Sequence, residues 1–107
     1  NACFGIVGLE TALPLSLKLV EDNVLSISDV IKKLTSTPAE IFNLNAGSLS
    51  PGKNADIVIF NPKHEYSIDI SKFHSKSKNS PFDGWKVKGK VIHTIVRGKT
   101  VYSATDN

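Results

Sequence analysis

The sequence predicts an α/β chain in which helices come first and strands follow. Apolar residues recur at helical spacing through roughly the first 45 residues, whereas β-branched runs dominate from Asp56 onward. Between these regions, Gly47, Pro51 and Gly52 form a turn-rich segment. Such a sequence either packs as an isolated α+β domain or supplies its helices and strands to a larger structure.

The first predicted helix begins near Glu10 or Thr11 and ends at about Asn23. Its apolar stripe consists of Leu13, Leu17 and Val20. Pro14 is compatible with the helix only in the first turn, because a missing N–H has no consequence there. The position of Pro14 therefore fixes where the helix starts.

Two further helices are predicted before residue 46. Ser28 is the expected N-cap of the first, with Asp29 close to the positive end of the helix dipole. The stretch TPAE is typical of a capping box, with Thr37 as the N-cap, Pro38 at the first helical position and Glu40 reaching back. The expected buried residues are Val30, Ile31, Leu34, Ile41, Phe42 and Leu44.

The second half of the chain predicts strands. A β-branched run from Asp56 to Phe60 should form a strand covered on both faces and stopped by Asn61-Pro62. The polar stretch HSKSKNSPFDGW is predicted to be a loop. The last residues, GKVIHTIVRGKTVYS, predict two strands joined by a tight turn at Arg97-Gly98-Lys99.

Composition is that of an ordinary globular protein, with 40% hydrophobic and 21% charged residues. The net charge of +3 is partly local, since six of the thirteen basic residues lie between Lys72 and Lys90. No nucleic-acid-reading motif accompanies them. The apolar run from Ala12 to Val20 is too short to span a bilayer. We therefore expect a cytoplasmic protein with neither nucleic acid nor membrane as a partner.

No catalytic constellation is apparent from spacing. The histidines, His64, His74 and His93, form no H-x-H or H-E-x-x-H pair. The single cysteine, Cys3, excludes an internal disulfide and is predicted to be an ordinary thiol. Asp56 is expected to accept backbone N–H bonds before its strand, and Phe82 with Trp85 suggests an aromatic anchor.

The opening stretch CFGIVG is the exception. Gly5 lets a ligand or another backbone approach closely, and a loop before a helix offers free N–H groups. The residues leave open the simpler alternative that Gly5 and Gly8 only permit a turn.

Four segments carry a resemblance to a known family. In chain order they are FGIVGLETALPL, LTSTPAEIFNL, GSLSPGKNADIVIFNP and SKSKNSPFDGWKVKGKVIHTIVRGKTVY. Together they resemble the C-terminal portion of dihydroorotase, a member of the amidohydrolase superfamily, over nearly the whole chain. The ADIVIF stretch is common to many amidohydrolases, whereas FGIVGLETALPL and SKSKNSPF are closer to the bacterial dihydroorotases of pyrimidine biosynthesis.

The resemblance implies a fold and its division. Residues 1–45 would be the last loop and C-terminal helices of a TIM-like, metal-dependent hydrolase barrel. Residues 46–107 would be the C-terminal strands of a small composite β-sandwich. The expected fold class is thus an α/β fragment of a larger enzyme.

The resemblance also implies an activity. Dihydroorotases are zinc-dependent cyclic amide hydrolases that interconvert N-carbamoyl-L-aspartate and L-dihydroorotate in UMP biosynthesis. Their zinc ligands and catalytic aspartate lie upstream of the matched portion, so no catalytic residue and no metal ligand is expected in this chain. The complete parent would be an enzyme, and this chain alone would not.

Phe4 and Gly5 match positions that the family uses for substrate binding, on a loop that closes over the substrate. Before them stand Ala2 and Cys3, where the family commonly has Ala-Pro. The absence of that proline is expected to loosen the loop while leaving the Phe-Gly contact in place.

The implied partners are the small-molecule substrate and the N-terminal barrel portion, with a homodimer or a complex with aspartate transcarbamoylase as further assemblies. Two alternatives stay open. The chain resembles, in its P-x-x-G and T-I-V-R-G patterns, the tails of allantoinases and dihydropyrimidinases. It could also be a non-catalytic, dihydroorotase-like assembly module.

Overall fold

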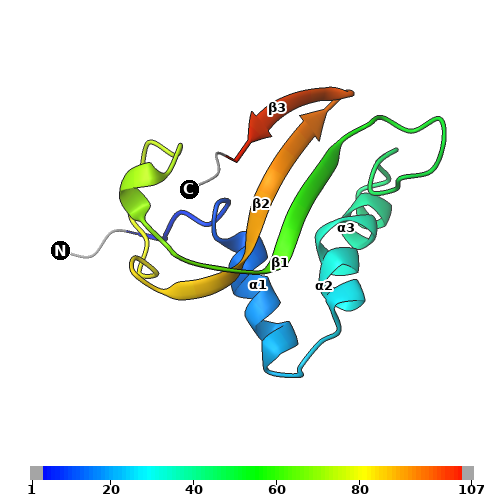
Figure 1. Cartoon of the computed structure of the whole chain (residues 1–107). Coiled ribbons are helices and arrows are strands. Elements are labelled where there is room, and N and C mark those ends of the chain that lie inside the picture. The colour runs from blue at the N-terminus through cyan, green and yellow to red at the C-terminus, as the bar shows by residue number, and fades with distance from the viewer. Residues whose placement is uncertain (1–3, 105–107) are drawn as a thin grey trace.

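Three helices precede a three-stranded antiparallel sheet in the computed structural model, which describes residues 4–104 (Figure 1). The elements are α1 (Ala12–Glu21), α2 (Ile27–Leu34), α3 (Ser36–Ile41), β1 (Ile57–Ser67), the short 3₁₀ helix η1 (Ile70–Lys72), β2 (Lys86–Val96) and β3 (Lys99–Ser103). The strands lie in the order β1-β2-β3. Helix α1 packs on β2, and α2 and α3 pack against each other. The predicted order of helices and strands is confirmed.

Helix α1 begins and ends where the sequence predicts. Its N-cap is Thr11, and Pro14 falls in the first turn. Thr11 is buried, and its hydroxyl donates to the Gly8 carbonyl at 3.3 Å rather than capping the helix. Just past the helix, Asn23 has a φ of 57° and turns the chain toward α2.

The predicted N-caps of α2 and α3 are wrong. Ser26, not Ser28, caps α2, and its Oγ accepts from the Asp29 backbone N–H at 3.1 Å. Thr35 is both the C-cap of α2 and the N-cap of α3, so Thr37 lies inside α3 and no capping box forms. The hydroxyl of Thr35 donates back to the Ile31 carbonyl at 2.7 Å, which leaves α3 without a side-chain cap.

The prediction that the first strand stops at Asn61-Pro62 is also wrong, because β1 continues to Ser67. Asn61 pairs with Lys90 and Glu65 with Lys88, so three residues of β1 stand opposite Gly89 alone. Pro62 lies in this bulge, where its missing N–H removes no ladder bond. The bulge therefore explains how a strand passes through a proline.

The turn between β2 and β3 is the predicted one. Arg97 and Gly98 both have positive φ, at 50° and 79°, as a two-residue hairpin turn of type I′ requires. Asp56 accepts the Arg97 backbone N–H at 2.9 Å, and the Gly98 N–H reaches the Ala55 carbonyl at 3.0 Å. The backbone-accepting role predicted for Asp56 is confirmed, and it ties the turn to the start of β1.

Predicted burial fails for two groups of residues. Val58 and Ile59, on opposite faces of β1, are 51% and 46% exposed. Of the six helical residues expected to be buried, only Val30 is, and Ile31, Leu34, Ile41, Phe42 and Leu44 are 38%, 44%, 72%, 72% and 60% exposed. Within residues 4–104, α1 packs on β2 and α3 packs mainly on α2, so β1 and the outer side of α3 stay largely uncovered. The core residues are Leu17, Val30, Ala39, Ile68 and Val87.

Membrane crossing was assessed on the described residues alone. None of the helices found there combines the length and the hydropathy that a bilayer span needs.

Gly89 is predicted to be the glycine of the sheet least tolerant of a side chain. Its φ is 108°, and a Cβ there would overlap Leu17 Cδ1 of α1. Gly89→Ala should destabilise the chain by about 2–4 kcal/mol through backbone strain plus overpacking. Gly98→Ala is the matched control, because its φ is also positive but the space around it is open. It should cost only about 1 kcal/mol, and equal losses for both variants in urea unfolding would contradict the packing role of Gly89.

The isolated chain is predicted to bind hydrophobic dyes. Exposed apolar side chains gather on α3, the following segment and β1, namely Ile41, Phe42, Leu44, Leu49, Val58 and Ile59. Exposed apolar area of this kind makes a protein self-associate. Fluorescence of an anilinonaphthalene dye should rise on mixing with the folded chain. A monodisperse monomer that leaves the dye dark would contradict this.

Candidate functional site

The loop before α1 presents the two residues expected to meet a substrate. Phe4 is fully exposed. Gly5 has a φ of 78°, and a Cβ built on it would have no heavy atom within 4 Å. The open surface at this point gives a ligand access to the backbone of both residues. Residues 1–3, including Cys3, lie outside the described part of the chain.

A second loop, residues 73–79, holds this first loop in place. The Val7 backbone N–H donates to the Asn79 carbonyl at 2.9 Å. The Asn79 side-chain amide in turn donates to the Gly5 carbonyl at 2.5 Å. Asn79 thus fixes the orientation of the Gly5 peptide, although the two residues are 74 positions apart in sequence.

Glu10 joins the same two loops at their other ends. Its Oε1 accepts the His74 backbone N–H at 3.1 Å, and its Oε2 accepts that of Ser75 at 3.2 Å. The His74 ring Nδ1 lies 3.4 Å from Oε1. Desolvation alone would raise the pKa of Glu10. The backbone N–H groups of His74 and Ser75 and the His74 ring together lower it by more. The pKa of Glu10 is therefore lowered, and the group is a carboxylate at neutral pH.

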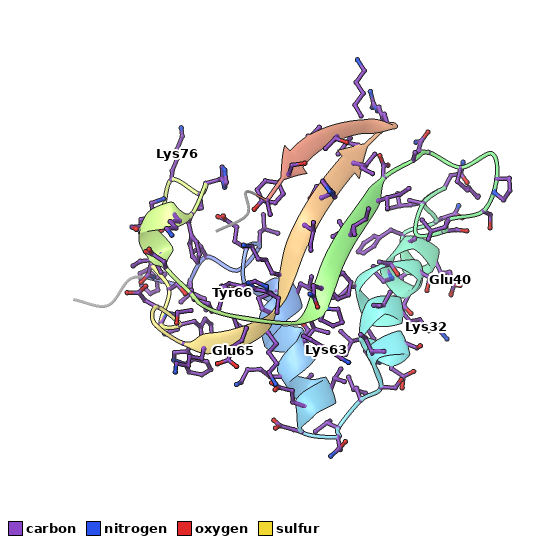
Figure 2. The ribbon with its side chains drawn as sticks, in the orientation of Figure 1. Lys32, Glu40, Lys63, Glu65, Tyr66 and Lys76 are labelled. Atoms are coloured by element: carbon purple, nitrogen blue, oxygen red, sulfur yellow. The ribbon has the colours of Figure 1, made fainter. Side chains whose placement is uncertain are left out.

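An open hollow of about 490 Å³ lies between the two loops. Its lining residues are Val7, Gly8, Leu9, Glu10, Phe73, His74 and Ser75. The ring of His74 is 86% exposed. Lys76, further along the same loop, extends into solvent away from the ribbon (Figure 2). The lining of the hollow is thus mainly apolar, with Glu10 and His74 as its titratable residues and no lysine or arginine among them.

The predicted aromatic anchor is present behind this loop. Phe82 and Trp85 stack edge to face, with ring centroids 4.9 Å apart. The Lys18 ammonium lies 5.8 Å from the Trp85 ring centre, which links the pair to α1. Ile68 and Trp85 are joined by a backbone bond of 2.9 Å. These contacts close the base of the 68–85 connection, so the loop at 73–79 starts from a fixed frame.

The histidines do not converge. His64 lies on β1, His74 on the loop, and His93 on β2, where its Nδ1 is 2.7 Å from Ser103 Oγ. Within residues 4–104, no three His, Asp or Glu side chains are grouped so as to hold a metal ion. Glu10 and Asn79, which organise the site, were not singled out by the sequence. Each contacts residues more than 60 positions away, and no spacing pattern reports such contacts.

Comparison with known proteins gives consistent results. Residues 1–101 match the amidohydrolase family. The dihydroorotase of Anaplasma phagocytophilum is 60% identical over 101 residues, and that of Ehrlichia canis is 53% identical over 107. These matches cover 94% and 100% of the chain, and 23% and 24% of the two relatives. The resemblance to dihydroorotase is thus confirmed, and the chain spans about a quarter of their length.

Solved structures show the same relationship. The L-hydantoinase (dihydropyrimidinase) of Arthrobacter aurescens superposes with a TM-score of 0.89 at 35% identity, over 98% of the chain and 24% of that protein. A D-hydantoinase superposes at 0.86 and 26% identity, over 94% of the chain and 22% of that protein. The expected fold class, barrel helices followed by strands of a small sheet domain, agrees with these matches. On this evidence, the chain belongs to the amidohydrolase family.

Proposed function

We propose that this chain is a segment of a dihydroorotase, the cyclic amide hydrolase that interconverts N-carbamoyl-L-aspartate and L-dihydroorotate in cytoplasmic pyrimidine synthesis. The observation that carries the proposal is the 60% identity to a dihydroorotase over 101 residues. The loop with Phe4 and Gly5, supported by residues 73–79, gives the proposal a physical site.

The chain's own contribution would be one lip of the substrate pocket. At Gly5 the backbone is bare, so a planar ring can lie against it and reach peptide groups. Asn79 already donates to the Gly5 carbonyl, which fixes the orientation of that peptide. The substrate would therefore meet a prepositioned backbone and the exposed ring of Phe4.

Zinc is the cofactor that the resemblance implies. The described residues offer no group of three ligands, so they do not fit a zinc site by themselves. We place the zinc ligands and the catalytic aspartate in the remaining three quarters of the enzyme. In the same way we assign residues 1–45 to the barrel and residues 46–107 to the small β-sandwich.

A second candidate function is that of a hydantoinase or dihydropyrimidinase, which the TM-score of 0.89 favours. The identity there is 35%, against 60% for the dihydroorotase, so dihydroorotase is the better supported. Turnover of L-dihydroorotate, hydantoin and dihydrouracil by the complete protein distinguishes the two. Turnover of none of them, with no zinc bound, would favour the non-catalytic assembly module.

The resemblance also implies assembly as a homodimer or with aspartate transcarbamoylase. Sedimentation of the complete protein, with and without the transcarbamoylase, distinguishes these arrangements.

Gly5 is predicted to control substrate affinity. In the complete enzyme, Gly5→Ala should raise the KM for dihydroorotate by about tenfold, because a Cβ would stand where the ring approaches the backbone. Zinc content should not change. Phe4→Leu should have a smaller effect, since it keeps the backbone and most of the apolar bulk. Steady-state kinetics on both variants measures this.

Gly52→Ala is the matched control for Gly5→Ala. Gly52 has a φ of 87° and equally open surroundings, so alanine introduces the same backbone strain away from the site. Its KM should equal that of the wild type. Equal KM changes in the two variants, or an unchanged KM for Gly5→Ala, would contradict the lip role.

The 107-residue chain alone is predicted to have no zinc-dependent hydrolase activity. A catalytic zinc takes three protein ligands, and the described residues do not bring three together. The measurement is dihydroorotate hydrolysis by the purified chain with added zinc. Activity that a chelator removes and zinc restores would contradict the prediction.

A further inference from the structure

We propose that Glu10 and Asn79 are positioning residues that together clamp the Phe4–Gly5 loop onto residues 73–79. The inference rests on the proposed function, because the loop is taken to meet the substrate. Neither residue touches the substrate in this proposal. They act through the backbone of Gly5 and Val7, and through the turn that leads into α1.

The clamp grips the loop at both ends. At one end, Asn79 uses its side-chain amide on the Gly5 carbonyl and its own carbonyl on the Val7 N–H. At the other, both carboxylate oxygens of Glu10 accept backbone N–H groups, one from His74 and one from Ser75. The chain from Gly5 to Glu10 is therefore held at three points, Gly5, Val7 and Glu10, against one short segment.

The geometry of Glu10 differs from that of a surface ion pair. Exposed pairs between long side chains contribute little, because both partners must be ordered. The donors to Glu10 are two successive backbone N–H groups, which have no side-chain freedom to lose and form charge-assisted bonds. The Glu10 side chain is also only 33% exposed. Such a bidentate contact fixes direction as well as distance.

Both halves of the clamp are anchored to regular structure. Glu10 stands directly before Thr11, whose N–H and hydroxyl both donate to the Gly8 carbonyl at the entrance to α1. On the other side, the Lys78 ammonium donates to the Phe73 carbonyl and closes residues 73–78 on themselves. Asp83 accepts the Ile70 N–H at 3.1 Å just before this loop. The clamp thus joins the entrance of α1 to a loop that is held by its own internal hydrogen bonds.

Loss of the clamp should change affinity more than chemistry. A loop that samples many orientations presents the Gly5 backbone to the substrate only part of the time. Binding in the ground state and in the transition state then weakens together, which raises KM and leaves kcat nearly unchanged. A merely structural role would instead lower the melting temperature, kcat and metal content in parallel.

The experiment uses the complete enzyme with Glu10→Gln, Asn79→Ala and both changes together. In Glu10→Gln, one carboxylate oxygen is replaced by an NH₂ group. That group faces a backbone N–H, so a donor stands opposite a donor and one hydrogen bond is lost. Each single variant should raise the KM for dihydroorotate about five- to tenfold, with kcat within about twofold. The double variant should raise KM by less than the product of the two, because the residues hold one loop.

Glu21→Gln is the matched control. Glu21 is also a carboxylate of the α1 region, but it pairs with Lys88 at 3.0 Å, away from the loop. Its KM should equal the wild-type value. A KM change in the control as large as in Glu10→Gln, or a fall of kcat and zinc content with unchanged KM, would overturn the proposal.

Hydrogen exchange provides a readout that needs no substrate. In Glu10→Gln, whichever of the His74 and Ser75 amides faces the new NH₂ group should exchange at least tenfold faster. In Asn79→Ala the Val7 amide should also exchange faster, because the backbone carbonyl that accepts it is no longer held by the side-chain bond to Gly5. Unchanged exchange overturns the clamp whatever the kinetics show. If the wild-type enzyme fails to turn over dihydroorotate, the proposed function is wrong, and faster exchange still establishes the clamp.

Discussion

The packing of α1 against β2 is the contact on which the rest of the structure depends. Gly89 is a point of close approach, since a side chain there would overlap Leu17 of α1. Around it, Glu21 pairs with Lys88 and Lys18 lies over Trp85. Within residues 4–104, this is the main contact between a helix and a strand. The bulge in β1 belongs to the same arrangement, because it places three residues opposite Gly89 and lets that glycine adopt its positive φ.

This single contact also explains why so much apolar surface is left exposed. Leu17 and Val87 are buried, at 5% and 2% exposure, because α1 covers one face of β2. No helix of the described part packs in the same way on β1 or on the apolar side of α3. The side chains of Lys32 and Glu40 mark the polar, outward side of α2 and α3 (Figure 2). The chain spans about a quarter of the length of these relatives. Its small core and its exposed apolar faces are those expected of a segment on which further layers pack.

Local sequence predicted the features that local physics decides. Pro14 located the start of α1, and the Arg97-Gly98 pair located the hairpin, because each has few permitted backbone conformations. The errors came where tertiary contacts choose between local options. Ser26 and Ser28 are both competent caps, and the path of the chain between α1 and α2 selects Ser26. A proline ends most strands, but here Pro62 is accommodated in the bulge opposite Gly89.

The candidate site shows the same division more sharply. Phe4 and Gly5 were identified by resemblance alone, and nothing in their local pattern distinguishes a substrate lip from a simple turn. Glu10, by its sequence, is an acid before a helix, and Asn79 is a polar residue in a loop. Their importance arises only when two segments more than 60 residues apart meet. The bonds that join the two loops link Gly5, Val7 and Glu10 to residues 73–79, so the orientation of the Gly5 peptide is set by a tertiary contact that no local pattern reports.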